Sequence, residues 1–174
     1  MVERKKILLL RLINALIFTV AVLLQYNDYF KINIRTANPM LPIALLVACC
    51  MFSSELTAAL TGLTVGIFID SVSSTPTGFN SMLLMVAALA VSLTAKHLFN
   101  NNIFAAFTLC FICSAFYYFM RWIFCFAFSL SFAENLTYLM SYALPSALYT
   151  AFFIIPLYYL ERFLYNKFYF LYRR

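Results

Sequence analysis

The 174-residue sequence has few charged residues, only three glycines and a single histidine. Charged residues make up 10% of the chain, whereas soluble domains usually carry about 25%. Twelve Lys+Arg and six Asp+Glu cannot cover a globule of this size, which excludes a water-soluble domain. Three glycines exclude collagen-like chains and glycine linkers. With one histidine and no paired carboxylates at helical spacing, we predict no catalytic set, no cofactor and no metal site.

Apolar and aromatic residues take the place of charge. The chain is 65% hydrophobic and 19% aromatic, with a mean hydropathy of +0.91, which excludes disorder. A membrane-spanning helix needs about 20 apolar residues, so this length holds about six spans and leaves little for a soluble domain. We therefore predict an all-α integral membrane protein with one multi-span domain, residues 1–174.

Long apolar runs give approximate boundaries for the spans. The predicted spans are 7–26, 40–53, 56–70, 79–98, 103–122 and 136–160. Residues 40–70 are one apolar stretch broken only around Ser53-Ser54-Glu55, so they could form one long helix or two short ones. The tail, 161–174, alternates aromatic with basic residues, which suits either a helix lying in the membrane interface or an extension of the last span.

Basic residues decide how residues 40–70 cross the membrane. Both ends of the chain are basic, and cytoplasmic segments carry an excess of Lys and Arg, so both termini are predicted to be cytoplasmic. The number of crossings is then even, which requires two crossings within 40–70 and a cytoplasmic turn near Glu55. Nine of the twelve basic residues then lie inside, and Lys31, Arg35 and Arg121 lie outside. The net charge of +6 is therefore a topology signal, and nucleic-acid binding is not predicted.

A stripe of small residues ends in a carboxylate. Ala58, Gly62, Gly66 and Asp70 are spaced by four, so they stack along one helix face. Small residues at this spacing let another helix backbone come close in a membrane. We predict a helix-packing or partner interface along the stripe, with Asp70 capping the outer end of this helix. The alternative is that Asp70 only terminates the helix at the lipid headgroups.

A loop and turn motif follows the stripe. Pro76 and Gly78 are turn residues that would fix the loop leading into the next span. Asn80, just past the turn, can offer donors and acceptors to Asp70 or to freed backbone groups. We expect Asp70, Pro76, Gly78 and Asn80 to act as one unit.

The order small-xxx-Gly-xxx-Gly-xxx-Asp, short loop, Pro-x-Gly-x-Asn, span resembles the central signature of the bacterial rod shape-determining protein family MreD. The specific residues lie within 58–84, and the length, the basic ends and the six apolar segments are similar over the whole chain. This chain has Thr77 where the family usually has Leu, and Ser73-Ser74 where the family often has glycine or another small residue.

The resemblance implies a non-enzymatic scaffold of the cell-elongation machinery in the bacterial cytoplasmic (inner) membrane. It implies an MreC-like single-span partner and, through it, MreB and the wall synthases, in support of rod shape and lateral peptidoglycan synthesis. It also implies a fold like the substrate-binding subunits of energy-coupling-factor transporters.

The alternative is a solute-binding subunit of such a vitamin transporter. Against that alternative, the first span has no Ala-xxx-Ala docking stripe, and the outer loops offer few polar groups to orient a solute.

Overall fold

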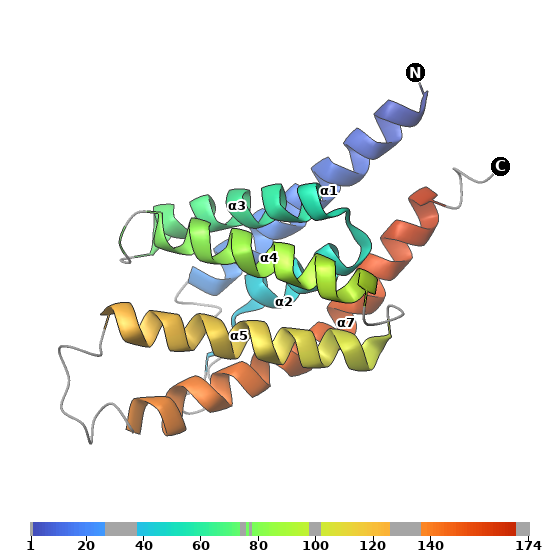
Figure 1. Ribbon diagram of the computed structural model, residues 1–174. Coiled ribbons are helices and arrows are strands. Elements are labelled where there is room, and N and C mark those ends of the chain that lie inside the picture. Colours follow the sequence, from blue (N-terminus) through green and yellow to red (C-terminus); the bar gives the residue numbers. More distant parts are fainter. Residues whose placement is uncertain are drawn as a thin grey trace.

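The computed structural model describes residues 2–26, 38–73, 76, 78–97, 102–125 and 137–169. All regular structure in these ranges is helical, which confirms the predicted all-α class (Figure 1). The elements are α1 (Val2–Tyr26), α2 (Leu41–Phe52), α3 (Glu55–Val72), α4 (Phe79–His97), α5 (Ile103–Cys125), the π-helical turn η2 (Leu139–Ala143) and α7 (Leu144–Tyr169).

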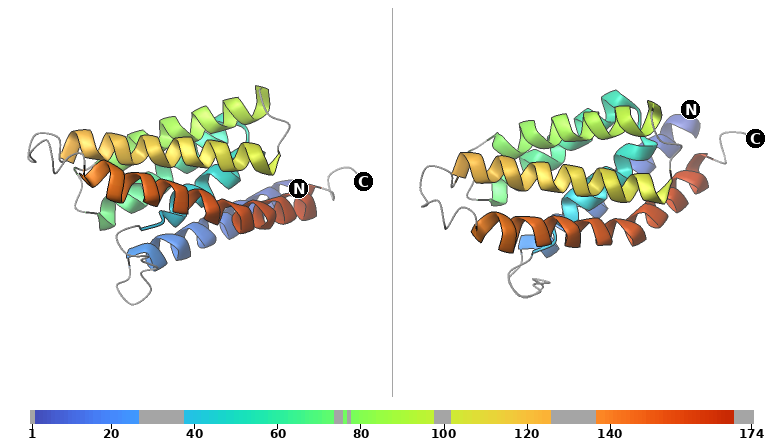
Figure 2. Two further views of the ribbon diagram at one scale, coloured as in Figure 1. Left: turned by 90° about the horizontal axis from the view of Figure 1, so that it is seen from below. Right: turned by 60° about the horizontal axis from the view of Figure 1, so that its bottom comes forward.

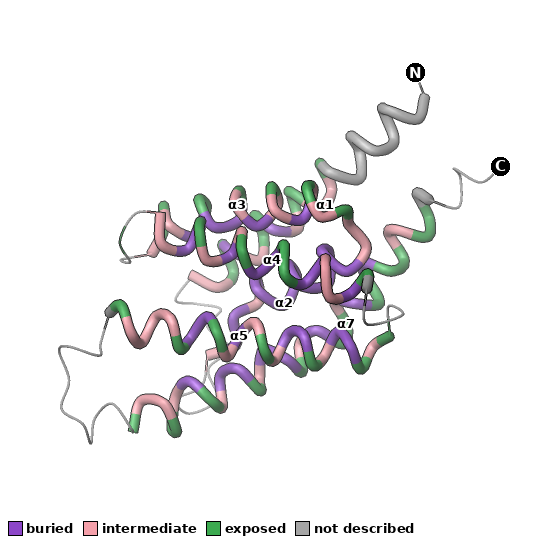
Figure 3. Tube along the Cα trace, in the orientation of Figure 1, coloured by how far each residue is buried: buried purple, intermediate pink, exposed green. Residues whose placement is uncertain are grey.

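Helix α2 lies at the centre of the bundle (Figures 1 and 3). Ten of its 12 residues, from Pro42 to Met51, are buried, and α1, α3, α4, α5 and α7 all contact it. Pro42 sits in the first turn, where its missing N–H leaves no hydrogen bond unmade. The helix ends at Phe52, and its C-cap residue Ser53 has an extended backbone (φ −99°, ψ 158°). A helix that is apolar on all sides is typical of a core position.

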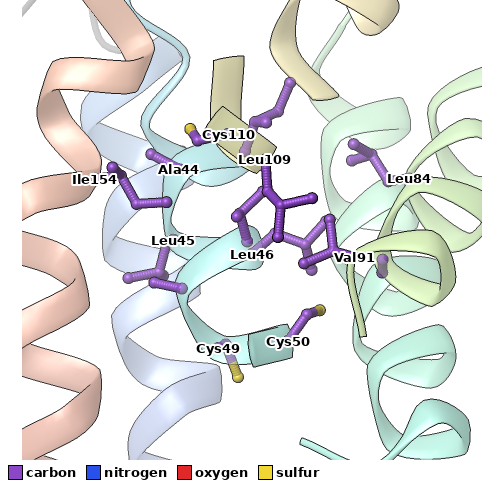
Figure 4. Packing of buried hydrophobic residues seen from close by; sticks show 14 of the residues in the cluster. Ala44, Leu45, Leu46, Cys49, Cys50, Leu84, Val91, Leu109, Cys110 and Ile154 are labelled. Atoms are coloured by element: carbon purple, nitrogen blue, oxygen red, sulfur yellow. The ribbon is translucent and has the colours of Figure 1, made fainter. Parts of the chain in front are cut away.

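Core side chains from the surrounding helices pack against α2. Figure 4 shows Leu84 and Val91 of α4, Leu109 of α5 and Ile154 of α7 around Leu46 and its neighbours on α2. The cysteines at 49, 50, 110 and 113 are free, and the first three are buried. They fill space as small polarizable groups, in keeping with their positions inside apolar runs.

Four helical segments in the described part of the chain are long and apolar enough to cross a membrane. They are Glu55–Val72, Phe79–Lys96, Ile103–Phe124 and Leu139–Lys167. Large apolar side chains such as Leu60, Phe104 and Phe152 are exposed on them, as expected for a surface in contact with lipid. Leu12–Tyr26 and α2 are shorter apolar helices. The predicted boundaries of the six spans stay predictions.

Residues 40–70 form two helices, α2 and α3, separated by Ser53 and Ser54. Successive helices run in alternating directions, so the start of α1 and the end of α7 lie at the same end of the bundle (Figures 1 and 2). Lys96 near the end of α4 pairs with Glu55 at the start of α3 (Nζ–Oε1 3.0 Å) at this end too. That this end faces the cytoplasm stays a prediction. Lys31 and Arg35 lie outside the described residues.

The last helix is longer than its predicted span. α7 continues without a break from the predicted end at residue 160 to Tyr169, so this part of the tail extends the helix and is not a separate interfacial helix. Glu161, the first residue of the predicted cytoplasmic or interfacial tail, is only 4% exposed. The reason is that its side chain faces α1 and α2 and not the water beyond the membrane surface. Residues 170–174 of the tail lie outside the described residues.

Candidate functional site

The stripe on α3 packs against α4, which runs antiparallel to α3 (Figure 1). Ala58, Gly62 and Gly66 are all buried. A Cβ placed on Gly62 would lie 2.5 Å from the carbonyl oxygen of Leu84 and 2.8 Å from Cβ of Ala88. Both distances are shorter than van der Waals contact, so only glycine permits this approach of the two backbones. Because α4 covers the stripe, the stripe serves packing within the chain, and a partner interface would have to use another surface.

Gly66 is the tightest point of the contact. A Cβ there would overlap the Cα and N of Ser81 and the carbonyl oxygen of Asn80. These are backbone atoms in the first turn of α4, so they cannot yield without moving the helix. The glycine therefore brings the start of α4 within reach of Asp70, one turn further along α3.

Asp70 caps the first turn of α4. Its Oδ1 accepts hydrogen bonds from the backbone N–H (3.1 Å) and Nδ2 (2.9 Å) of Asn80. Its Oδ2 accepts from the backbone N–H (3.0 Å) and the hydroxyl of Ser81. N–H groups in the first turn of a helix have no partner within that helix, and the positive end of the helix dipole favours a carboxylate there.

The cap differs from our expectation, which placed Asp70 at the end of its own helix. In the last turn of α3 the exposed backbone groups are carbonyls, which a carboxylate cannot bond. The side chain therefore turns to the donors that α4 offers, among them the expected donor Asn80, and joins the two helices.

Asn80 connects this contact to a third helix. Its side chain is fully buried, and its Nδ2 also lies 3.2 Å from Ser73 Oγ, to which it donates. Its Oδ1 accepts a hydrogen bond of 2.8 Å from the hydroxyl of Tyr117, which is itself 1% exposed on α5. One network therefore ties together α3, α4 and α5.

Two members of this network escaped the sequence analysis. Ser81 directly follows Asn80, and a search for polar residues in the first turn after the Pro-x-Gly turn would have found it. Tyr117 gives no such signal, because it lies in a run of aromatic residues and its partner is 37 residues away in the sequence.

Pro76 and Gly78 shape the turn between the helices through their backbone carbonyls. The carbonyl of Pro76 accepts from the N–H of Phe79 (3.1 Å), and that of Gly78 accepts from Met82 (3.1 Å). Gly78 has φ = +89°, which side chains disfavour, although a Cβ there would meet no atom within 4 Å. The residues Ser74 and Thr77 lie outside the described residues. The structure thus brings Asp70 and Asn80 into contact and places Pro76 and Gly78 beside them; their importance for function stays a prediction.

Comparison with known proteins places this chain in a family. The family model described as rod shape-determining protein MreD matches residues 5–168, nearly the whole chain. Comparison with curated proteins and with solved structures found no match. The predicted family resemblance is therefore confirmed, whereas the likeness to transporter subunits stays a prediction. The chain belongs to the MreD family of multi-pass, structural membrane proteins with a role in determining rod shape.

Proposed function

We propose that this protein is a non-enzymatic scaffold that holds an MreC-like single-span partner in the bacterial cytoplasmic membrane. Through that partner it connects to MreB and the wall synthases during lateral peptidoglycan synthesis. Membership of the MreD family carries the proposal. We further propose that both termini lie in the cytoplasm, which is supported by the basic chain ends and by the start of α1 and end of α7 lying together (Figure 2).

The chemistry of the α3–α4 contact favours a structural role over a catalytic one. Each carboxylate oxygen of Asp70 already accepts two hydrogen bonds, and the side-chain oxygen of Asn80 is bonded to Tyr117. Groups engaged in this way hold helices in a fixed arrangement. A rigid set of helices is what a scaffold needs to present a constant surface to a partner helix.

The partner would contact a surface other than the stripe. In a membrane, apolar side chains alone do not drive helices together, because lipid is equally apolar. Association of a partner helix therefore depends on the shape of the surface that it contacts. That shape is constant only when the helices of this protein are held in fixed positions relative to one another. We expect the Asp70–Asn80–Tyr117 network to support partner binding indirectly, by fixing α3, α4 and α5 relative to one another.

The test is co-purification of the full-length tagged chain from its membranes in mild detergent. We expect an MreC-like single-span protein at near stoichiometric yield, and a lower yield with Asp70→Ala. Glu55→Gln, which removes a carboxylate in an exposed ion pair, is the matched control and should leave the yield unchanged. Recovery of a transporter ATPase module in place of the single-span protein would overturn the proposal.

A further inference from the structure

A second buried polar cluster lies where α1, α2 and α7 meet, in the half of the bundle where α7 ends (Figure 2). Asn14 Nδ2 of α1 lies 3.4 Å from Glu161 Oε2 of α7 and 3.4 Å from Cys49 Sγ of α2. Two oxygen atoms here, Asn14 Oδ1 and Glu161 Oε1, are buried and have no hydrogen-bond partner among the described residues. Buried polar atoms without partners are rare in native proteins, so this pair calls for an explanation.

An ionised Glu161 fits these surroundings poorly. A carboxylate can only accept hydrogen bonds, and here it receives one, at 3.4 Å. Asp70 of the same chain shows what a satisfied carboxylate has: four hydrogen bonds and the N-terminus of a helix. Glu161 has neither, although it is the more buried of the two and lies in a helix long enough to span a membrane. An isolated charge in that position is costly.

A neutral carboxylic acid fits them well. A protonated carboxyl carries one O–H donor, and an acid can form two hydrogen bonds with an amide. In one, the amide N–H donates to an acid oxygen, as Asn14 Nδ2 does to Glu161 Oε2. In the other, the acid O–H donates to the amide oxygen, which would join the two atoms that lack partners. A single proton on Oε1 would therefore give both atoms a partner.

We propose that Glu161 binds a proton in the folded protein and that this proton closes a two-bond pair with Asn14, linking the first helix to the last. The site is separate from the Asp70 network and does not depend on the proposed scaffold function. Its ligand is the proton, and its effect is to make the α1–α7 contact depend on pH.

No described basic side chain near the site could neutralise an ionised Glu161 in place of the proton. From α2, the buried thiol of Cys49 faces the site. On α7 the neighbouring Arg162 is exposed, and on α3 Glu55 is paired with Lys96. None of the described side chains forms an ion pair with Glu161; the side chain of Arg11 on α1 lies outside the described ones. Loss of the proton would thus leave a buried charge, so stability should fall as the pH rises.

The test is thermal unfolding of the full chain in detergent from mildly acidic to mildly alkaline pH. We expect the melting temperature of the natural chain to fall by at least about 2 °C towards alkaline pH. Glu161→Gln should match it at acidic pH and stay level, because the amide makes both hydrogen bonds and cannot ionise. Glu55→Gln, the matched control at an exposed glutamate, should keep the natural pH profile.

Two outcomes would overturn the proposal. One is the same pH profile for the natural chain and Glu161→Gln. The other is a loss of stability at every pH in Glu161→Gln that Arg11→Gln reproduces, which would make Glu161 a charged partner of Arg11. Infrared spectroscopy of the natural chain tests the proposal even if a variant does not fold. A carbonyl band of a neutral carboxyl group at neutral pH supports the proposal. The absence of that band contradicts it.

Discussion

Asp70 and Glu161 show how far the surroundings of a carboxyl group determine what it can do. Both are acidic residues near the end of a long apolar helix. Asp70 faces the first turn of α4 and accepts four hydrogen bonds, whereas Glu161 faces two helix sides and accepts one. The first is therefore a helix cap, and we propose that the second holds a proton.

At this scale we predict that Asp70→Ala destabilises the protein by about 1–3 kcal/mol, because it leaves the donors of Asn80 and Ser81 without an acceptor. Asp70→Asn should cost less, because its amide oxygen can still accept the hydrogen bonds on one side of the cap. Some cost remains, because its NH2 group cannot accept a hydrogen bond from Ser81. Thermal unfolding in detergent and rescue of rod shape in cells that lack the protein measure the effect. Normal rod growth and unchanged stability in Asp70→Ala would make Asp70 only a helix end at the headgroups.

At the scale of the elements, the close packing of α3 against α4 depends on glycine. Gly62 and Gly66 let the backbones approach until a single Cβ would overlap the partner helix. That approach places the Asp70 carboxylate on the first turn of α4. The helix pair and its cap therefore depend on each other, and neither is a property of one helix alone.

We predict that Gly66→Leu prevents correct folding or partner recovery, because the side chain would have to enter the backbone of Ser81. The sequence suggests Val65, which is off the stripe, as a control position, but Val65 is only 3% exposed. Ala90→Leu is the better control, since Ala90 is a small, exposed residue on α4 of the same pair. Detergent stability and partner yield would be compared, and equal behaviour of the two variants would remove the close-packing argument.

The whole molecule shows how a helix of 12 residues fits into a membrane protein. α2 is about 18 Å long at 1.5 Å per residue, shorter than a hydrocarbon core of about 30 Å. It is surrounded by other helices and not by lipid, so its ends need not reach the headgroups on both sides. It still runs back between α1 and α3, which point in the same direction (Figure 1). This is why the argument from two basic chain ends, which requires an even number of crossings, led to two helices within 40–70.

For the whole chain we predict that reporters fused after residues 55 and 174 give a cytoplasmic signal and that a reporter after residue 76 gives an extracytoplasmic one. The physical reason is the excess of Lys and Arg at the end of the bundle that holds both helix termini. Fusions with enzymes active on only one side of the membrane make the measurement. An extracytoplasmic signal after residue 174 would contradict the six-span topology.

The sequence by itself determined the class, the number of helices and the family. These depend on the length of apolar runs, on breaks such as Ser53-Ser54 and on short motifs, all of which are local along the chain. It also marked Gly62, Gly66 and Asp70 as belonging to one helix face, because helical spacing is local too.

Only the tertiary structure decided what those residues contact. It placed α2 in the centre, turned Asp70 towards α4, brought Tyr117 to Asn80 across 37 residues and set Asn14 beside Glu161 across 147. Hydropathy cannot distinguish these arrangements, because apolar residues occur on every face of these helices and any face could turn inward. Which helix faces pack together depends on where glycines allow two backbones to approach closely, and on where the few buried polar groups find hydrogen-bond partners. Both depend on residues far apart in the sequence.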